Sequence, residues 1–423
     1  MTESPEIEIV SLPPYQELRF IMKVGDRALV EITSGEAYSF GWQLPLYTQT
    51  TFRDQPFPIS TKHGCTLKVG GTFTSYYTAP LEEFQFIDNI CQSINNGISP
   101  SIFIVGASSV GKTSLCKLIC NSILDKCPEK YPIYVNADPD QAPFCPQGCI
   151  SAAPITTPIN NFGFPFTDPL MYLYASTKVD EKRSSLFIGQ LEELMNHVAE
   201  RRKNAAMTNS SDGCAVFDFP SITSKHLLEL LEKTIQIEES FTKNPSAIHI
   251  IVVGDDRLYT NIHRSMPKFK AMKTSMLSGV ITLSKEMRSD LRNIETKRYF
   301  YGDGNPELLP TTYLLTKEDN TTLYSLGPFV AARDESMMPL FQGGALPDPK
   351  VLQPVIFGER IVGLILAIVP RVNKADTWKQ PVIGFLHVIE LGANEKQVNV
   401  LKPNPDPLPS SVLLVSQVKW VPK

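Results

Sequence analysis

"SIFIVGASSVGKTSLCKLIC", residues 101–120, is the stretch of sequence that decides the fold. The apolar run "SIFIV" leads directly into glycines spaced as G-x-x-x-x-G-K-[ST], and a segment of helical character follows. The glycines let the backbone turn tightly and point its N–H groups at a phosphate, with the positive end of the next helix dipole behind them. We therefore predict a strand, a phosphate-binding loop and a helix in this order.

The loop supplies the first candidate site residues. Lys112 is expected to reach the β- and γ-phosphates of a nucleotide, and the Thr113 hydroxyl is expected to bind Mg²⁺. A glycine turn without a ligand is the alternative, but the position between a predicted strand and a predicted helix favours nucleotide binding. The predicted nucleotide-binding residues of the loop are Gly106, Ser108, Ser109, Val110, Gly111, Lys112, Thr113 and Ser114.

Two acidic residues close later predicted strands. Asp138 ends the strand in "YVNADPDQ", and Asp218 ends "GCAVFDF". In a parallel sheet the carboxyl ends of the strands face the crevice that holds the phosphate loop, so either acid can hold Mg²⁺ or polarise a nucleophile. Each acid can instead cap a turn. We favour the functional interpretation for Asp138, as a metal ligand beside Thr113, and with it for Gln141; for Asp218 the two interpretations are balanced.

A pair of arginines forms a further candidate. Arg288 and Arg292 lie four residues apart and share one face of a predicted helix. Their guanidinium groups can fold over a triphosphate and neutralise the charge that develops during transfer. Arginines spaced in this way are also common in surface salt bridges, so both interpretations stay open.

The 423 residues divide into three predicted segments. Residues 1–97 contain short alternating strands, including 36–44, and end in an amphipathic helix, which predicts a small β-sandwich or barrel. Residues 98–306 alternate strands with helices, which predicts a parallel sheet with helices on both faces. Residues 307–423 again contain strand-like segments, which predicts a C-terminal β-rich domain. The predicted fold is thus an α/β, P-loop NTPase-like central domain between an N-terminal β-sandwich and a C-terminal β-rich domain.

Composition narrows the environment of the protein. A net charge of -4 and an isoelectric point near 6.0 provide no general attraction to nucleic acid or to anionic membranes. The start of the chain lacks the features of a signal peptide, and the longest apolar runs fall far short of the ~20 residues of a membrane span. The eight scattered cysteines are expected to be reduced and buried. The polar segment 199–213 is predicted to be a surface loop. These features favour the cytosol or the nucleus.

Several further segments carry a resemblance to a known family: "QELRF", "TSGEAYSFGWQL", "KHGC", "DPDQ", "QGCISAAPI", "RSDLRNIETKRYFYG" and "LKPNPDPLP". With the phosphate loop, they make the chain similar to polynucleotide 5′-hydroxyl kinases, and among these to the ATP-binding subunits of the messenger-RNA cleavage and polyadenylation machinery. The resemblance implies ATP as cofactor, with its adenine side covered by the N-terminal domain. Glu17 matches a nucleotide-contacting position of the family, and Pro56 falls where a second contact is usually lysine.

The chain departs from the active kinases of this family at two places. They carry a T-x-G-W clasp whose aromatic ring stacks on the terminal base of RNA, whereas residues 218–222 read "DFPSI". Phe219 is the one aromatic residue there that can take the stacking role. Active members also carry D-x-G-Q-G, whereas residues 138–143 read "DPDQAP", so that two prolines and the carboxylate of Asp140 should crowd or repel an RNA end. Both departures resemble the fungal branch, in which ATP is bound and kinase activity is lost.

Three functions follow from these patterns. The first is an ATP-binding structural subunit of a nuclear complex similar to cleavage factor IA. It docks on a scaffold subunit and other 3′-end-processing proteins, with indirect RNA contact and no membrane. The second is an active Mg²⁺-dependent kinase of RNA 5′ ends, for which the phosphate-side residues are present but the grip on the RNA end is missing. The third, a switch NTPase, needs a guanine-reading N-K-x-D segment that the sequence lacks. The catalytic candidates of the second function are Lys112, Thr113, Asp138, Arg288 and Arg292.

Overall fold

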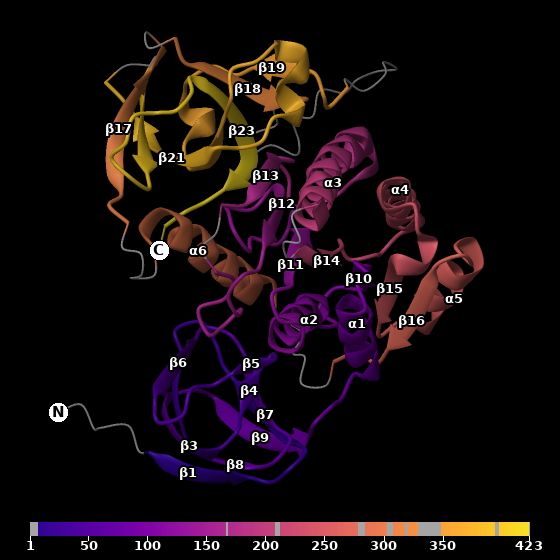
Figure 1. The fold of residues 1–423 in the computed structure, drawn as a ribbon. Helices are drawn as coiled ribbons and strands as arrows, with labels where there is room; N and C mark the ends of the chain where they lie inside the picture. Colours follow the sequence, from indigo (N-terminus) through magenta and orange to yellow (C-terminus); the bar gives the residue numbers. More distant parts are fainter. Residues whose placement is uncertain are drawn as a thin grey trace, which may run out of the picture.

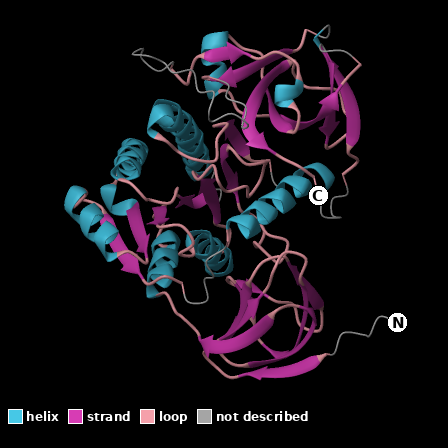
Figure 2. Ribbon diagram, turned by 180° about the vertical axis from the view of Figure 1, so that it is seen from behind, coloured by secondary structure: helices cyan, strands magenta, loops and turns pink. Residues whose placement is uncertain are grey.

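The structure is a computed structural model. It describes residues 7–165, 168–207, 212–277, 284–302, 308–317, 320–328, 348–393 and 397–422. Figure 1 shows three bodies in a row, with the α/β domain between an N-terminal and a C-terminal β domain, and Figure 2 shows the same arrangement from behind. Within the described ranges, no helix has both the length and the apolar character needed to cross a membrane.

The N-terminal domain consists of two antiparallel sheets that enclose their own core. One sheet has the strand order β1 (Glu8–Leu12), β8 (Cys65–Thr72), β3 (Arg27–Gly35), β6 (Gln49–Arg53). The other has the order β5 (Trp42–Gln43), β4 (Tyr38–Ser39), β7 (Phe57–Thr61), β2 (Gln16–Ile21), β9 (Ser75–Pro80). Inward side chains such as Leu18, Ile59 and Leu67 are fully buried between the sheets. The predicted β-sandwich is confirmed.

One predicted strand of this domain is wrong. Residues 36–44 form a tight hairpin, in which β4 pairs with β5 across a turn at Phe40 and Gly41. Both turn residues have positive φ, 46° and 78°, which is the conformation of the two-residue turns that fit twisted hairpins. The hairpin places Phe40 at a tip that faces the central domain.

The central sheet has seven strands. Their order is β13 (Leu170–Leu173), β12 (Cys149–Pro154), β11 (Tyr131–Asn136), β14 (Asp212–Asp218), β10 (Ser101–Gly106), β15 (Ile248–Val253), β16 (Lys270–Thr274). The last five of these are parallel to one another, as predicted, but β12 and β13 extend the sheet with antiparallel pairing. The sheet is therefore mixed. β12 reads "CISAAP", in which Ile150 is the one β-branched residue, so it lacks the run of β-branched and aromatic residues that marks a strand in the sequence.

Helices cover both faces of the central sheet, as predicted (Figure 1). The side chains of β10 alternate between them: Ile102 and Ile104 pack toward one face, Phe103 and Val105 toward the other. Helices α1 (Gln85–Asn95) and α2 (Lys112–Lys126) cover the first face, and α3 (Ser184–Met207) and α4 (Lys225–Thr242) cover the second. The remaining helices are α5 (Asp256–Ser265) and α6 (Lys285–Tyr301), with short 3₁₀ turns at Glu181–Arg183, Pro245–Ala247, Glu359–Ile361 and Lys374–Lys379.

The polar segment 199–213 is not a loop over the part that can be described. Helix α3 continues to Met207, residues 208–211 lie outside the described residues, and β14 begins at Asp212. The arginines, lysine and alanines of this segment are strong helix formers. Arg202 also anchors the helix, because it pairs with the buried carboxylate of Glu238 at 2.9 Å and donates to the Ser99 carbonyl at 2.6 Å. The charge of Arg202 thus helps to hold α3 against α4, which carries Glu238.

The C-terminal domain is β-rich, as predicted. Its sheet has the order β17 (Thr311–Thr316), β22 (Gln397–Lys402), β21 (Gly384–Leu391), β20 (Leu364–Val369), β23 (Val412–Lys419), β18 (Thr322–Leu326), β19 (Leu352–Pro354). Backbone hydrogen bonds tie it to the central domain: the Val382 N–H donates to the Met171 carbonyl at 2.8 Å, and the Gln417 N–H to the Ala175 carbonyl at 3.0 Å. The two domains also share one apolar core.

Candidate functional site

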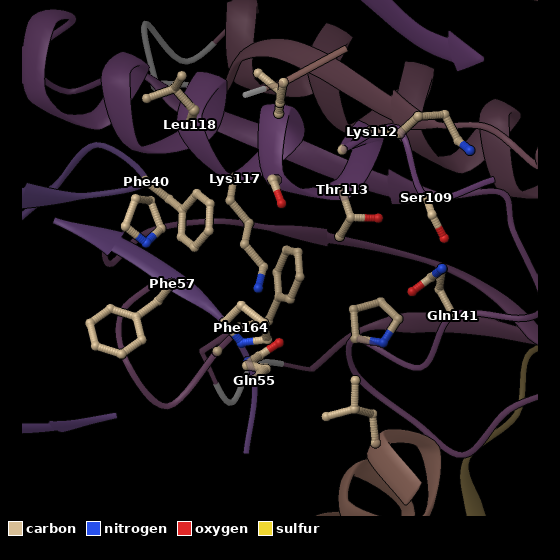
Figure 3. Close-up of a pocket in the computed structure, with 18 of the residues that line it drawn as sticks. Phe40, Gln55, Phe57, Ser109, Lys112, Thr113, Lys117, Leu118, Gln141 and Phe164 are labelled. Carbon is tan, nitrogen blue, oxygen red and sulfur yellow. The ribbon is translucent and has the colours of Figure 1, made fainter. Parts of the chain in front are cut away.

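A cavity of about 450 Å³ lies between the N-terminal and central domains, at the carboxyl ends of the parallel strands (Figure 3). Its walls come from β2 and the segment around β7, the loop after β10, the start of α2, the loop after β11, and α6. This volume is within the range of small-molecule sites, and the position is where open α/β sheets bind their ligands. The cavity is therefore the candidate functional site.

The structure gathers most of the predicted site residues at this cavity. The wall includes Glu17, Pro56, Ser108, Ser109, Gly111, Lys112, Thr113, Ser114, Asp138, Gln141, Arg288 and Arg292. Two predicted residues do not line it: Gly106 ends β10, and Val110 is buried in the core. The glycine loop thus reaches the cavity through its middle and end.

The phosphate loop needs glycine at both glycine positions of its motif, Gly106 and Gly111. Gly111 directly precedes α2 with φ 96°, a left-handed conformation that side chains rarely adopt. A Cβ at Gly106 would lie 2.7 Å from the Val253 carbonyl oxygen on the neighbouring strand, which is too close. The backbone conformation of the loop therefore depends on these two residues.

Lys112 already has oxygen partners at the cavity. Its ammonium group donates to the Ala107 carbonyl at 2.9 Å and to the Ser221 hydroxyl at 2.9 Å, and only 7% of the residue is exposed. Oxygen atoms of a phosphate can take the place of such partners. Ser221 also lines the cavity, a role that the sequence did not indicate, because only the folded sheet brings the segment after β14 beside the loop.

Thr113 is paired with Asp218. The Thr113 hydroxyl donates to Oδ2 of Asp218 at 2.6 Å, and the Tyr134 hydroxyl donates to the same oxygen at 3.0 Å. Burial raises the pKa of Asp218, although Lys112 and these two hydrogen bonds oppose the shift. The pairing follows from strand order, since β14 lies directly beside β10. Asp218 therefore lies next to the hydroxyl that is predicted to bind Mg²⁺.

Asp138 lies on the cavity wall in an environment that favours its neutral form. Burial raises its pKa to about 7; Lys112 lowers it and Asp218 raises it further. The backbone N–H of Asp140 donates to Oδ1 of Asp138 at 3.0 Å and fixes the carboxyl group. A carboxyl group with a pKa near neutrality can exchange a proton with a bound group at cellular pH.

The donor set fits Mg²⁺ only in the company of a nucleotide. No group of three or more His, Cys, Asp or Glu side chains among the described residues could hold a metal ion by itself. Mg²⁺ in nucleotide sites is held through one or two carboxylates and takes its other ligands from water and substrate phosphates. Thr113, Asp138 and Asp218 match such a limited set.

Both arginines of α6 reach the loops that border the cavity. Arg288 Nη1 donates to the Ser108 hydroxyl in the phosphate loop at 3.1 Å. Arg292 Nη1 pairs with Oδ1 of Asp140, in the loop after β11, at 2.7 Å. Arg292 does form a salt bridge, but its partner lies on the wall of the same cavity. The helix therefore borders the cavity, and its two arginines reach loops on the side of the glycine loop.

The N-terminal domain contributes the other side of the cavity. Glu17 is buried and paired with Arg19, and burial raises the pKa of Glu17 against the effect of that arginine. Pro56 lies on the wall beside Phe57. The predicted contacts Glu17 and Pro56 thus both line the cavity, from the N-terminal domain.

A lysine between aromatic rings was missed at the sequence level. The Lys117 ammonium lies 5.8 Å from the ring centroid of Phe40 and 5.6 Å from that of Phe164, and Figure 3 shows its side chain running toward Phe164. Burial lowers the pKa of Lys117. Lys117 is four residues after Thr113 on α2, so helical spacing places both on one face and could have indicated it.

The fold and the glycine loop define a P-loop protein, a class that binds phosphate groups at the start of a helix. Three family models match consecutive parts of the chain. They describe an N-terminal beta-sandwich domain of polyadenylation factor at residues 11–96, the mRNA cleavage and polyadenylation factor CLP1 P-loop at residues 106–302, and pre-mRNA cleavage complex II protein Clp1 at residues 308–422. The chain belongs to the Clp1 family.

Relatives with different names match over nearly the full length. A CLP1 homolog of Nematostella vectensis is 26% identical, covering 96% of this chain and 94% of its own. The mRNA cleavage and polyadenylation factor CLP1 of Saccharomyces cerevisiae is 24% identical over 97% of this chain and 94% of its own. The polyribonucleotide 5′-hydroxyl-kinase Clp1 of Xenopus tropicalis is 25% identical over 96% of this chain and 92% of its own.

A solved structure of Clp1p in complex with a segment of Pcf11p has the same fold. It superposes with a TM-score of 0.82 at 23% identity and covers 98% of both chains. A second solved structure, which concerns the Pcf11p–Clp1p interface and ATP loss in a point mutant, also has a TM-score of 0.82, at 22% identity over 98% of this chain and 99% of that one.

Proposed function

We propose that this protein is the ATP-binding structural subunit of a nuclear pre-mRNA 3′-end cleavage and polyadenylation complex, and that it holds ATP without efficient turnover. The observation that carries the second part is the segment after β14. Phe219, the one aromatic residue there and the candidate for stacking on an RNA base, is fully buried against Phe187. Ser221, two residues later, is bonded to Lys112. This segment therefore offers no ring to an RNA end.

In this function the nucleotide bridges two domains. We assign the phosphates to the glycine loop and Lys112, Mg²⁺ to Thr113 with Asp138 or Asp218, and the base to the side of Glu17 and Pro56. When bound, Mg²⁺ neutralises phosphate charge. At a free ATP concentration about a thousandfold above the dissociation constant, binding stabilises the bound arrangement by about 4 kcal/mol. That is comparable with the whole stability of many domains.

The proposed partners and location of the protein are based on its relatives. The Saccharomyces cerevisiae relative is named as a cleavage and polyadenylation factor, and a Clp1p of the same fold was solved with a segment of Pcf11p. We infer that this chain docks on a corresponding scaffold subunit and other 3′-end-processing proteins in the nucleus, with RNA contacted indirectly. We place the domain boundaries near residues 97 and 306, with α1, at the end of the first segment, packed on the central sheet.

A second candidate function is an active Mg²⁺-dependent polynucleotide 5′-hydroxyl kinase. The Xenopus tropicalis relative carries that name. Lys112, Asp138, Arg288 and Arg292 all line the cavity. In that reaction Asp138 would accept the proton of the RNA hydroxyl, and the two arginines would stabilise the transferring phosphoryl group.

One experiment separates the two functions. Purified protein is incubated with γ-labelled ATP and 5′-hydroxyl RNA, and any nucleotide that survives purification is identified. We expect intact ATP in the wild type, its loss in Lys112→Ala, and unlabelled RNA throughout. Lys126→Ala, at the exposed end of the same helix, is the matched control and should retain ATP. Labelling of RNA that depends on Lys112 would establish the kinase instead.

The partner needs its own test. A pulldown with the full chain as bait from a nuclear extract is expected to retain the scaffold subunit of the 3′-end-processing complex, identified by mass spectrometry. Retention of none of the 3′-end-processing proteins would remove the basis for this part of the proposal.

A further inference from the structure

Helix α6 connects the two loops that border the phosphate side of the cavity. Arg288 reaches the phosphate loop through Ser108 at 3.1 Å, and Arg292 reaches the loop after β11 through Asp140 at 2.7 Å. All four residues line the cavity. The first half of the helix is therefore tied to both loops, through residues that a triphosphate would approach.

Asp140 is held in an orientation that presents its carboxylate to Arg292. Its backbone N–H donates to Asp138 at 3.0 Å, and its carbonyl accepts a hydrogen bond from Gln147 at 2.9 Å. On the other side, Nε of Arg292 donates to the Arg288 carbonyl at 3.1 Å. Two nitrogens of Arg292 thus donate to protein acceptors, and one of these acceptors, the carboxylate of Asp140, carries a negative charge.

A phosphate and this carboxylate need the same guanidinium. Carboxylates and phosphates both form charge-assisted, often bidentate hydrogen bonds with arginine. The side chains of Arg292 and Asp140 are 31% and 37% exposed, and ion pairs at such exposure are weak. A phosphate can therefore displace Asp140 from Arg292. We call this displaceable ion pair between Arg292 and Asp140 the latch.

We propose that Asp140 is a positioning residue that competes with the terminal phosphate of a bound nucleotide for Arg292. This inference rests on the proposed function, because it presupposes a nucleotide in the cavity. Asp140 lowers the preference for a triphosphate over a diphosphate, since the charge of Arg292 is already neutralised when the terminal phosphate arrives. The latch also keeps Arg292 from supporting phosphoryl transfer.

The test compares the affinities of the full-length protein for ATP and ADP, measured in Mg²⁺ by competition with a fluorescent nucleotide. Asp140→Asn keeps the size of the side chain and removes its charge, and it is expected to raise the ATP-to-ADP affinity ratio about fivefold. Asp140→Glu, which retains the charge, should leave the ratio near that of the wild type. An unchanged ratio in Asp140→Asn overturns the proposal.

A second background shows whether the effect acts through Arg292. In Arg292→Gln, the further change Asp140→Asn should not alter the ATP-to-ADP ratio, because no guanidinium is left to release. If Asp140 acts only by repelling the phosphate directly, the gain persists in that background, and the latch is overturned.

A measurement without nucleotide keeps this proposal separate from the proposed function. Hydrogen exchange of residues 284–302 in the nucleotide-free protein should rise in Asp140→Asn and in Arg292→Gln, with no further rise in the double variant. Unchanged exchange in both single variants contradicts the latch whether or not the protein binds ATP. Failure of the wild type to bind ATP, with exchange behaving as expected, contradicts the proposed function alone.

Discussion

The central domain meets its two neighbours through different kinds of contact. Toward the C-terminal domain the contact is apolar and continuous: Phe300 of α6 stacks on Trp420 with the ring centroids 5.2 Å apart and the planes within 10°. Both rings belong to the same buried core as strands β10, β11 and β14. Backbone hydrogen bonds from Val382 and Gln417 complete this joint.

Toward the N-terminal domain the contact is polar and leaves a cavity. Nδ2 of Asn121 donates to the Phe40 carbonyl at 2.9 Å, and Nδ2 of Asn161 donates to the Thr51 carbonyl at 2.9 Å. The core of the N-terminal β-sandwich is separate from the central ones, whereas α1 packs in a central core. A shared apolar core makes two domains fold together, whereas a polar joint around a cavity leaves part of its stabilisation to a ligand.

The largest effect is expected from a substitution in the apolar contact between the central and C-terminal domains. Trp420→Ala should lower the free energy of unfolding by about 3–5 kcal/mol, because it removes a buried ring from the shared core. Since the core is shared, the central and C-terminal domains should unfold together at lower denaturant. Urea unfolding followed by circular dichroism and by nucleotide binding measures both.

Val421→Ala is the matched control for this prediction. Val421 is adjacent in the chain and 58% exposed, so its truncation should change the stability by no more than about 0.5 kcal/mol. If Trp420→Ala melted the C-terminal sheet while nucleotide binding persisted to the wild-type midpoint, the two domains would not share a folding unit.

The two joints should respond to pH with opposite signs. Burial raises the pKa of Asp138 at the cavity from 3.8 to about 7, so the nucleotide-free protein binds a proton at Asp138 more strongly when it is folded. The contribution of Asp138 to the free energy of unfolding therefore falls as the pH rises between these two values. His387 beside Trp420 has its pKa lowered from 6.5 to about 4 by burial, so its contribution rises with pH across that range. Each slope is at most about 1.4 kcal/mol per pH unit.

Two variants separate these slopes. Between pH 4 and 6.5, the free energy of unfolding of Asp138→Asn minus that of wild type should increase with pH. The same difference for His387→Gln should decrease with pH. Parallel profiles for the two variants, measured by urea denaturation at several pH values, would show that neither group titrates as its surroundings indicate.

The smallest effect concerns the polar joint. Asn121→Ala removes the bond to Phe40 and two bonds to Ile159, and should cost about 1–2 kcal/mol. We expect faster protease cleavage in the connection between β9 and α1 and weaker ATP binding, because the hairpin tip loses its anchor. Asn95→Ala, which removes one exposed bond to the Lys126 carbonyl, serves as the control. Equal cleavage rates in both variants would argue against Asn121 as the anchor.

Much of the fold was predictable because its signals are local. The alternation of strands and helices gives the layers of the central domain, and the apolar spacing of α1 gives its buried face at Ile87, Ile90 and Ile94. The eight cysteines are free and buried, as expected from their scattered positions. The misplaced elements have weak local signals: β12 is built mostly of small residues, and the last turns of α3 are rich in charged residues, of which Arg202 pairs with the buried Glu238.

The candidate site was predictable only in part. The glycine loop is contiguous, so its residues could be listed from the pattern alone. Asp218 could not be chosen over a turn cap, because its nearness to Thr113 depends on β14 lying next to β10. Helical spacing from Thr113 places Lys117 on the same face of α2, but its aromatic neighbours, Phe40 of the N-terminal hairpin and Phe164 of the central domain, meet it only in the folded protein.

The sequence by itself determined the phosphate loop, its helix and the layered α/β centre, since each depends on backbone conformation and spacing within a few consecutive residues. Only the tertiary structure decided which acid meets Thr113, which carboxylate holds Arg292 and which joint is apolar. These contacts join residues more than a hundred positions apart, and strand order and domain packing bring them together. Local residue preferences carry no information about such distances.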